Sequence, residues 1–178
     1  WGQEGWRTTV QDFQINGYYE RSIENGIDPA HNEYVHDTHG FSGEREDEYK
    51  IGDMRVEENA PWGRGFWHTF QAPPLQGDLK KYRAGEGSLE AGTGYHGTNH
   101  VWTYIHPGPN FFIHQYLYER PIDDKSTHLY LVCARTFSLE EKTDAYVIER
   151  NRYVADQDVK IIESLHPMIT PDRNNKEY

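Results

Sequence analysis

The sequence predicts an α+β domain in which short helices, a curved antiparallel sheet and a long C-terminal helix follow one another. Several segments alternate polar and apolar residues and are joined by short turns, which is typical of antiparallel strands. Near the C-terminus, apolar residues recur at helical spacing instead. The chain has 178 residues, enough for one domain with a sizeable core. Packing such a helix across such a sheet gives the predicted class.

The first third of the chain is expected to be mixed. Residues 1–15 alternate loosely and end at Asn16-Gly17, a turn signal. Residues 18–27 predict a short helix, and Asp28-Pro29 indicates the start of a second one, with Asp28 as its N-cap. Residues 37–53 are polar and Gly-rich, so we expect a loop there.

The middle of the chain supplies the strands. Alternation predicts strands at 54–58, 64–71, 95–106, 111–119 and 127–137. The last two give the clearest signal, and Pro121–Lys125 is expected to form the turn between them. Residues 72–94 are rich in Pro, Gly and Lys and predict a long irregular excursion that could act as a lid.

The C-terminal helix carries a carboxylate where an apolar residue is expected. Ser138-Leu139-Glu140-Glu141 fits a capping box, and His166-Pro167 is expected to end the helix. The apolar stripe of this helix consists of Val147, Val154, Ile161 and Leu165. Asp158 lies inside that stripe, and an ionised carboxylate there is costly unless it is paired. An ion pair with Arg135 would explain it, and so would a metal ion.

Composition excludes several classes of function. The net charge of −11 argues against nucleic acid and anionic membranes as partners, because both need a basic surface. We find no apolar run of about 18 residues that could span a membrane. Cys133 is the only cysteine, so the chain holds no internal disulfide or iron–sulfur cluster, and we expect a cytoplasmic protein. The chain opens at Trp1 without a Met, and we expect it to be a piece of a longer protein.

Asp28, His31 and His36 form the most informative cluster. Two imidazoles at this spacing can reach one metal ion, and one carboxylate from elsewhere would complete a 2-His-1-carboxylate site, which suits non-haem Fe(II). Positions five apart diverge by about 140° on an ideal helix, so the two rings converge only if the helix ends between them. With ten histidines in the chain, the pair could also be ordinary surface residues, and His39 is a rival ligand.

The order of these motifs resembles the catalytic domain of Rieske-type non-haem iron oxygenases. The stretch from Asn25 through Asp28 and His31 to His36 resembles the family's Asn-x2-Asp-x2-His-x4-His signature. The stretch Asp158–Pro167 resembles a later Glu-Asp-x4-Glu-x3-Pro stretch, with Gln157 in the place of the usual Glu. Two further segments, 121–127 and 134–137, are similar to the branch that includes vanillate demethylase.

The resemblance implies a helix-grip fold of the START and Bet v 1 type over residues 1–178, as a single catalytic domain. It implies His31, His36 and Asp158 as iron ligands, and Asp28 as the carboxylate that links a neighbouring subunit's Rieske [2Fe-2S] cluster to this iron. The cluster motifs are missing, so the N-terminal Rieske domain is absent from this chain. A homotrimer and a reductase or ferredoxin electron donor are implied as well.

The activity implied is hydroxylation or oxidative demethylation of an aromatic or other cyclic small molecule with O2, by a mono- or dioxygenase. We expect aromatic side chains of the strands to line the substrate site, and they include Trp102, Tyr104, Phe112, His114 and Tyr116. Two alternatives remain open. A non-catalytic helix-grip ligand-binding domain would pair Asp158 with a basic side chain, and a zinc hydrolase would use the same three ligands.

Overall fold

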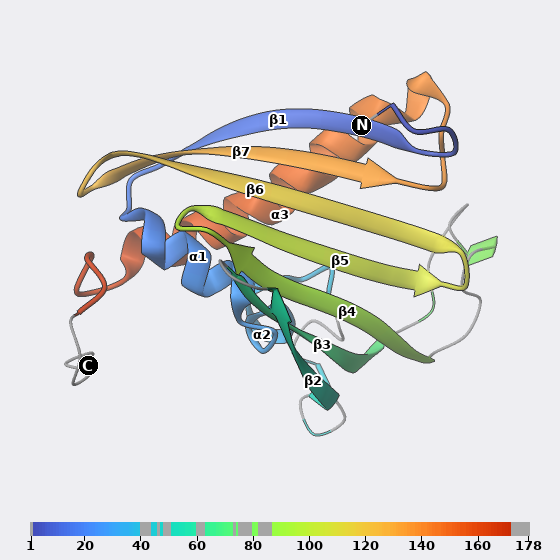
Figure 1. The fold of residues 1–178 in the computed structure, drawn as a ribbon, viewed down its shortest axis with the longest axis horizontal. Helices are drawn as coiled ribbons and strands as arrows, with labels where there is room; N and C mark the ends of the chain where they lie inside the picture. The colour runs from blue at the N-terminus through green and yellow to red at the C-terminus, as the bar shows by residue number, and fades with distance from the viewer. Residues whose placement is uncertain are drawn as a thin grey trace.

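The protein is a single antiparallel sheet packed against helices (Figure 1). The computed structural model describes residues 2–39, 44–45, 47, 51–59, 63–72, 74, 80–81 and 87–171. The strands are β1 (Arg7–Ile15), β2 (Ile51–Asn59), β3 (Gly63–Ala72), β4 (Gly87–His96), β5 (His100–Gly108), β6 (Phe111–Asp123) and β7 (Ser126–Arg135). Their order in the sheet is β1-β7-β6-β5-β4-β3-β2, so the N-terminal strand lies beside the last one.

The helices are α1 (Tyr19–Ile27), α2 (His31–Val35) and α3 (Asp144–Ser164), and a short 3-10 turn, η2 (Glu141–Thr143), precedes α3. Figure 1 shows α3 running across the sheet, with α1 and α2 beside its C-terminal half. The predicted α+β class, a helix-grip domain with a long C-terminal helix, is confirmed. No helix in the described part of the chain is long and apolar enough to cross a membrane.

The two faces of the sheet differ in what covers them. On the helix-covered face, Thr93 of β4 donates a hydrogen bond from its hydroxyl to the carbonyl of Gly26 in α1, at 2.9 Å. Residues directly opposite one another in antiparallel strands share a face, so Phe66, Thr103 and Gln115 lie on this face too. The opposite face, here called the outer face, carries Trp67 and the side chains in register with it.

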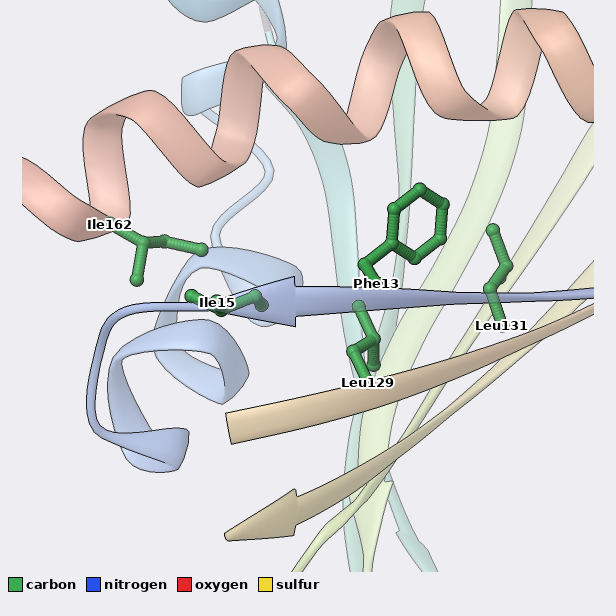
Figure 2. Packing of buried hydrophobic residues seen from close by; sticks show 5 residues of the cluster. All are labelled: Phe13, Ile15, Leu129, Leu131 and Ile162. Carbon is green, nitrogen blue, oxygen red and sulfur yellow. The ribbon is translucent and has the colours of Figure 1, made fainter. Parts of the chain in front are cut away.

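The hydrophobic core joins α3 to the sheet edge formed by β1 and β7. Figure 2 shows Ile162 of α3 pointing toward the sheet, where the cluster consists of Phe13, Ile15, Leu129, Leu131 and Ile162. These strand residues alternate with exposed ones along β1, as expected for a sheet with one covered face. The predicted apolar stripe was wrong at one position, because Ile161 is 42% exposed whereas Ile162 is 4% exposed.

We therefore expect Ile162→Ala to destabilise the protein by about 2–5 kcal/mol, because it leaves a cavity in this core. Ile161→Ala, the matched change one residue earlier, should cost less than about 1 kcal/mol. Urea denaturation of both variants, followed by far-UV circular dichroism, measures the two free energies of unfolding. Equal losses in the two variants would contradict the packing described here.

Several predicted boundaries differ from the structure. The strand predicted at 95–106 is two strands, β4 and β5, which turn at residues 97–99. Residues 87–94, predicted as irregular, belong to β4, and residues 51–53, predicted as loop, belong to β2. The predicted turn at Pro121–Lys125 was also too long, because β6 continues to Asp123. Parts of the predicted loop at 37–53 and of the excursion at 72–94 lie outside the described residues.

The capping box predicted at Ser138 was wrong, because α3 begins only at Asp144. Ser138 has φ of 50°, a left-handed conformation that cannot start a helix. Its carbonyl accepts hydrogen bonds from the buried Arg135 guanidinium at 3.0 and 3.1 Å, and from the Thr143 hydroxyl at 2.7 Å. These bonds hold the segment before α3 in an irregular path that leads into η2.

Candidate metal centre

Two histidines reach the same point because α2 is short. After α1 ends at Ile27, Asp28 follows as its C-cap, and α2 spans only five residues from His31 to Val35. His36 is the C-cap of α2, with φ −104° and ψ 120°, an extended conformation. The helix thus ends between the two histidines, as the spacing in the sequence required if the two rings were to converge. Their ring centroids lie 5.2 Å apart.

The carboxylate of Asp158 on α3 faces both rings. Its Oδ1 lies 3.5 Å from Nε2 of His31 and 3.2 Å from Nε2 of His36. One donor atom from each of the three side chains lies within 4.8 Å of the other two. Atoms that bind one ion at about 2.1 Å and at right angles are about 3 Å apart, so the spacing fits a single metal ion.

The hydrogen bonds of the other ring nitrogens support a metal at this point. His31 Nδ1 donates to the backbone carbonyl of Asp28, and His36 Nδ1 donates to Oε1 of Gln157 at 3.0 Å. Each ring assigned in this way presents an Nε2 lone pair to the Asp158 carboxylate, so three acceptors converge with no proton between them. A second proton on His36 can relieve the repulsion among these atoms, in line with its raised pKa, and so can a metal ion. Among metal ions, two imidazoles with one carboxylate suit Fe(II). The donor set therefore fits iron.

The pKa values of His36 and His39 shift in opposite directions. Burial lowers the pKa of His36, but the hydrogen bond and charge of Asp158 outweigh it, so that the pKa is raised from its ordinary value. His39 behaves differently: burial, followed by the charge of His36, lowers its pKa to about 3. The His39 ring lies tilted against the His36 ring, with centroids 4.6 Å apart, but His39 is outside the donor set found among the described residues, whereas His31 is within it.

No Lys or Arg side chain among the described residues pairs with Asp158. Besides the two imidazoles, its Oδ1 accepts a hydrogen bond from the Asn25 amide at 3.0 Å. The ion pair with Arg135 that the sequence left open does not form, because Arg135 pairs with Asp144 at 2.7 Å. The arrangement that would mark a purely ligand-binding domain is therefore missing from the described part of the chain.

Asp28 lies next to the site, but its local role differs from the predicted one. It is not the N-cap of α2, since Ala30 occupies that position. Its Oδ1 instead accepts a hydrogen bond from the backbone N–H of Ala30, at 2.8 Å, which closes a turn before the helix. Its contact with His31 is made by the backbone carbonyl, so the carboxylate itself remains exposed beside the ring.

The five side chains predicted to line the substrate site lie on the face of the sheet that the helices do not cover. These outer-face residues are Trp102, Tyr104, Phe112, His114 and Tyr116. Tyr104 is opposite Gly92, which is opposite Trp67, and the glycines Gly65 and Gly94 leave room for the Trp102 ring. A shallow outer-face pocket of about 140 Å³ beside Trp6, His114 and Tyr116 is therefore on the opposite side of the sheet from the helices that carry the histidines and Asp158.

Gln157 is the site residue that sequence reasoning noted only as a departure from a motif. It precedes Asp158 on α3 and contacts His36, and its spacing to Asp158 was the only available signal. Nothing in the sequence shows which residue an amide will contact 121 positions away.

Comparisons with known proteins identify the fold. The structure is similar to dicamba monooxygenase bound to 3,6-dichlorosalicylic acid, with a TM-score of 0.70 and 12% identity, covering 96% of this chain and 54% of that one. It is also similar to NdmA of Pseudomonas putida CBB5 with caffeine, with a TM-score of 0.69 and 20% identity, covering 98% and 48%. At these identities the likeness establishes the fold, and the chain spans about half the length of these structures.

A comparison with curated protein sequences found no match. The family model of the vanillate O-demethylase oxygenase C-terminal domain matches residues 15–178, which is nearly the whole chain. The chain therefore belongs to the family of vanillate O-demethylase oxygenase C-terminal domains.

Proposed function

We propose that this chain is the mononuclear-iron catalytic domain of a Rieske-type oxygenase, with His31, His36 and Asp158 as the iron ligands. The convergence of two Nε2 lone pairs on one carboxylate is the observation that carries the proposal. Family membership supports it, because the family is named for an oxygenase that removes a methyl group.

The reaction we propose is hydroxylation or oxidative demethylation of an aromatic or other cyclic small molecule. Iron held by the three ligands would supply the activation of O2. In a monooxygenation, one oxygen atom enters a C–H bond and the other leaves as water, with two electrons and two protons consumed. A hydroxylated O-methyl or N-methyl group then departs as formaldehyde, which completes a demethylation. In a dioxygenation both oxygen atoms enter the ring instead.

The electrons require a part of the protein that this chain does not contain. We propose that an N-terminal Rieske [2Fe-2S] domain supplies them, fed by a reductase or ferredoxin, in a cytoplasmic homotrimer where a neighbouring subunit's cluster approaches this iron. The exposed Asp28 carboxylate beside His31 is suited to meet that cluster domain. Residues 1–178 would then be the single catalytic domain.

We place the substrate against the helix-covered face of the sheet, since α1 and α3 carry site residues on that side. On this face the rings of Phe66 and Phe70 lie 5.7 and 5.8 Å from that of His68. His68 is 5% exposed, and its Nδ1 has no hydrogen-bond partner among the described residues. Burial lowers the pKa of His68, which favours the neutral imidazole. Its Nδ1 can then donate or accept one hydrogen bond with a polar group of an aromatic substrate.

Metal analysis of protein purified without oxygen tests the proposal. We expect about one iron per chain, removable by a chelator and restored by Fe(II) added without oxygen. A folded protein that holds no metal would instead favour a non-catalytic helix-grip ligand-binding domain. A protein that holds zinc and rejects iron would favour a zinc hydrolase. Formaldehyde release or ring hydroxylation by the full-length protein, with its electron donor, then tests the reaction itself.

A further inference from the structure

A chain of hydrogen bonds leads from His36 to the surface of the protein. His36 Nδ1 donates to Oε1 of Gln157 at 3.0 Å, and Nε2 of Gln157 donates to Oδ1 of Asp37 at 3.0 Å. The hydroxyl of Tyr153 donates to the other oxygen of Asp37 at 2.5 Å. Gln157 and Tyr153 are one helical turn apart on α3, whereas Asp37 directly follows His36.

Asp37, at the surface end of this series of hydrogen bonds, determines which group donates in each bond. An ionised carboxylate only accepts hydrogen bonds, so Asp37 must face the NH2 group of the Gln157 amide. That orientation turns Oε1 toward His36, and an oxygen in this position accepts a proton only from an Nδ1–H. The proton of the ring is thereby held at Nδ1, and the Nε2 lone pair is left for the metal.

The two histidine ligands differ in this respect. His31 donates its Nδ1–H to the backbone carbonyl of Asp28, a partner that no substitution removes. His36 depends on a side chain, and this side chain stands directly before the ligand Asp158 in α3. One turn of α3 thus supplies one ligand and the support of another, while His31 provides an internal reference for any measurement.

We propose that Gln157 is a positioning residue for His36, and that Asp37 and Tyr153 fix the orientation of its amide. The inference rests on the proposed iron site. Because Asp37 follows His36 in the chain, the bonds close a ring from the imidazole through Gln157 and Asp37 back to the backbone. This closed loop of hydrogen bonds restrains the His36 side chain, even though His36 lies at the end of a five-residue helix.

Cobalt(II) provides the test, because it replaces iron at imidazole and carboxylate sites, absorbs visible light and shifts nearby proton resonances. Wild-type protein should show two strongly shifted, exchangeable N–H resonances, one from each ligand histidine. Gln157→Leu, which keeps the size of the side chain, should lose the His36 resonance and retain that of His31. Its dissociation constant for Co(II) should rise about 10- to 100-fold.

Two further variants separate positioning from folding. Gln157→Glu combined with Asp37→Asn keeps an acceptor at Nδ1 and a donor–acceptor pair between positions 157 and 37, and should therefore keep both resonances. Asp156→Asn, an exposed change on the same helix, should leave affinity and spectrum unchanged, and far-UV circular dichroism checks the fold of each variant. Wild-type affinity with both resonances in Gln157→Leu would overturn the proposal and leave the metal site standing. Failure of the wild-type protein to bind Co(II) would overturn the site itself.

Discussion

Asp158→Ala should abolish stoichiometric iron binding, which is the largest effect expected of any single change in this protein. Asp158 is the only anionic member of the donor set, and both imidazoles face it. Removing a residue that merely supports a ligand already costs about 10- to 100-fold in metal affinity, so loss of the carboxylate itself should cost at least about 100-fold. Iron per chain, measured after anaerobic purification of mutant and wild type side by side, gives the result.

Asp156→Ala serves as the control for this experiment, because Asp156 is exposed on α3 and two residues from the ligand. It should retain about one iron per chain. The Asp158→Ala protein should still fold, since among the described residues the Asp158 carboxylate contacts only the two imidazoles and the Asn25 amide. One iron per chain in Asp158→Ala would show that the metal is held elsewhere.

Glu119 should contribute a loss of stability as the pH rises from about 4.5 to about 7, opposite in sign to the contribution of histidines such as His39, whose pKa is lowered by burial. The Glu119 side chain is 0% exposed, and burial raises its pKa from 4.5 to about 7. Between these values the folded protein keeps a proton that the unfolded chain has released, so the stabilisation is complete below 4.5 and is lost by about 7. At about 1.4 kcal/mol per pH unit, the whole loss is on the order of 3–4 kcal/mol.

Glu119→Gln removes this titration while keeping the oxygen that accepts the Ser22 hydroxyl proton, at 2.7 Å. The difference in free energy of unfolding between the variant and wild type should therefore shift by about 2–3 kcal/mol, in favour of the variant, between pH 5 and pH 8. Urea denaturation at both pH values with a chelator present measures it. Glu149→Gln, an exposed change, should show no such shift, and a constant difference for Glu119→Gln would refute the assignment.

The sequence predicted that His31, His36 and Asp158 lie close together better than it predicted what surrounds them. Spacing indicated that His31 and His36 could meet only if the helix ended between them, and α2 ends at Val35. Periodicity identified Asp158 as a misplaced carboxylate, although the core position beyond it is Ile162 and not Ile161. Both signals are local, because spacing and helical period need no knowledge of the rest of the fold.

The predictions failed where contacts between residues far apart in the sequence determine the local structure. Alternation in β6 correctly separated Phe112, His114 and Tyr116 from their neighbours, but alternation cannot tell which face the helices cover. Likewise, the local sequence predicts Ser138 as a helix cap, but in the structure its carbonyl accepts a hydrogen bond from the buried guanidinium of Arg135. The role of Gln157 depends on a contact across 121 positions, which a single sequence does not reveal.

The wide separation of the ligands along the chain has a thermodynamic consequence. Strands β2 to β7 all lie between His36 and Asp158. An ion bound by both ends would act as a reversible cross-link that closes a loop of about 120 residues, much as a disulfide does, but only in the folded state. Resistance to heat and proteolysis would then rise with the logarithm of the free metal concentration, so that metal supply would govern the lifetime of the folded domain.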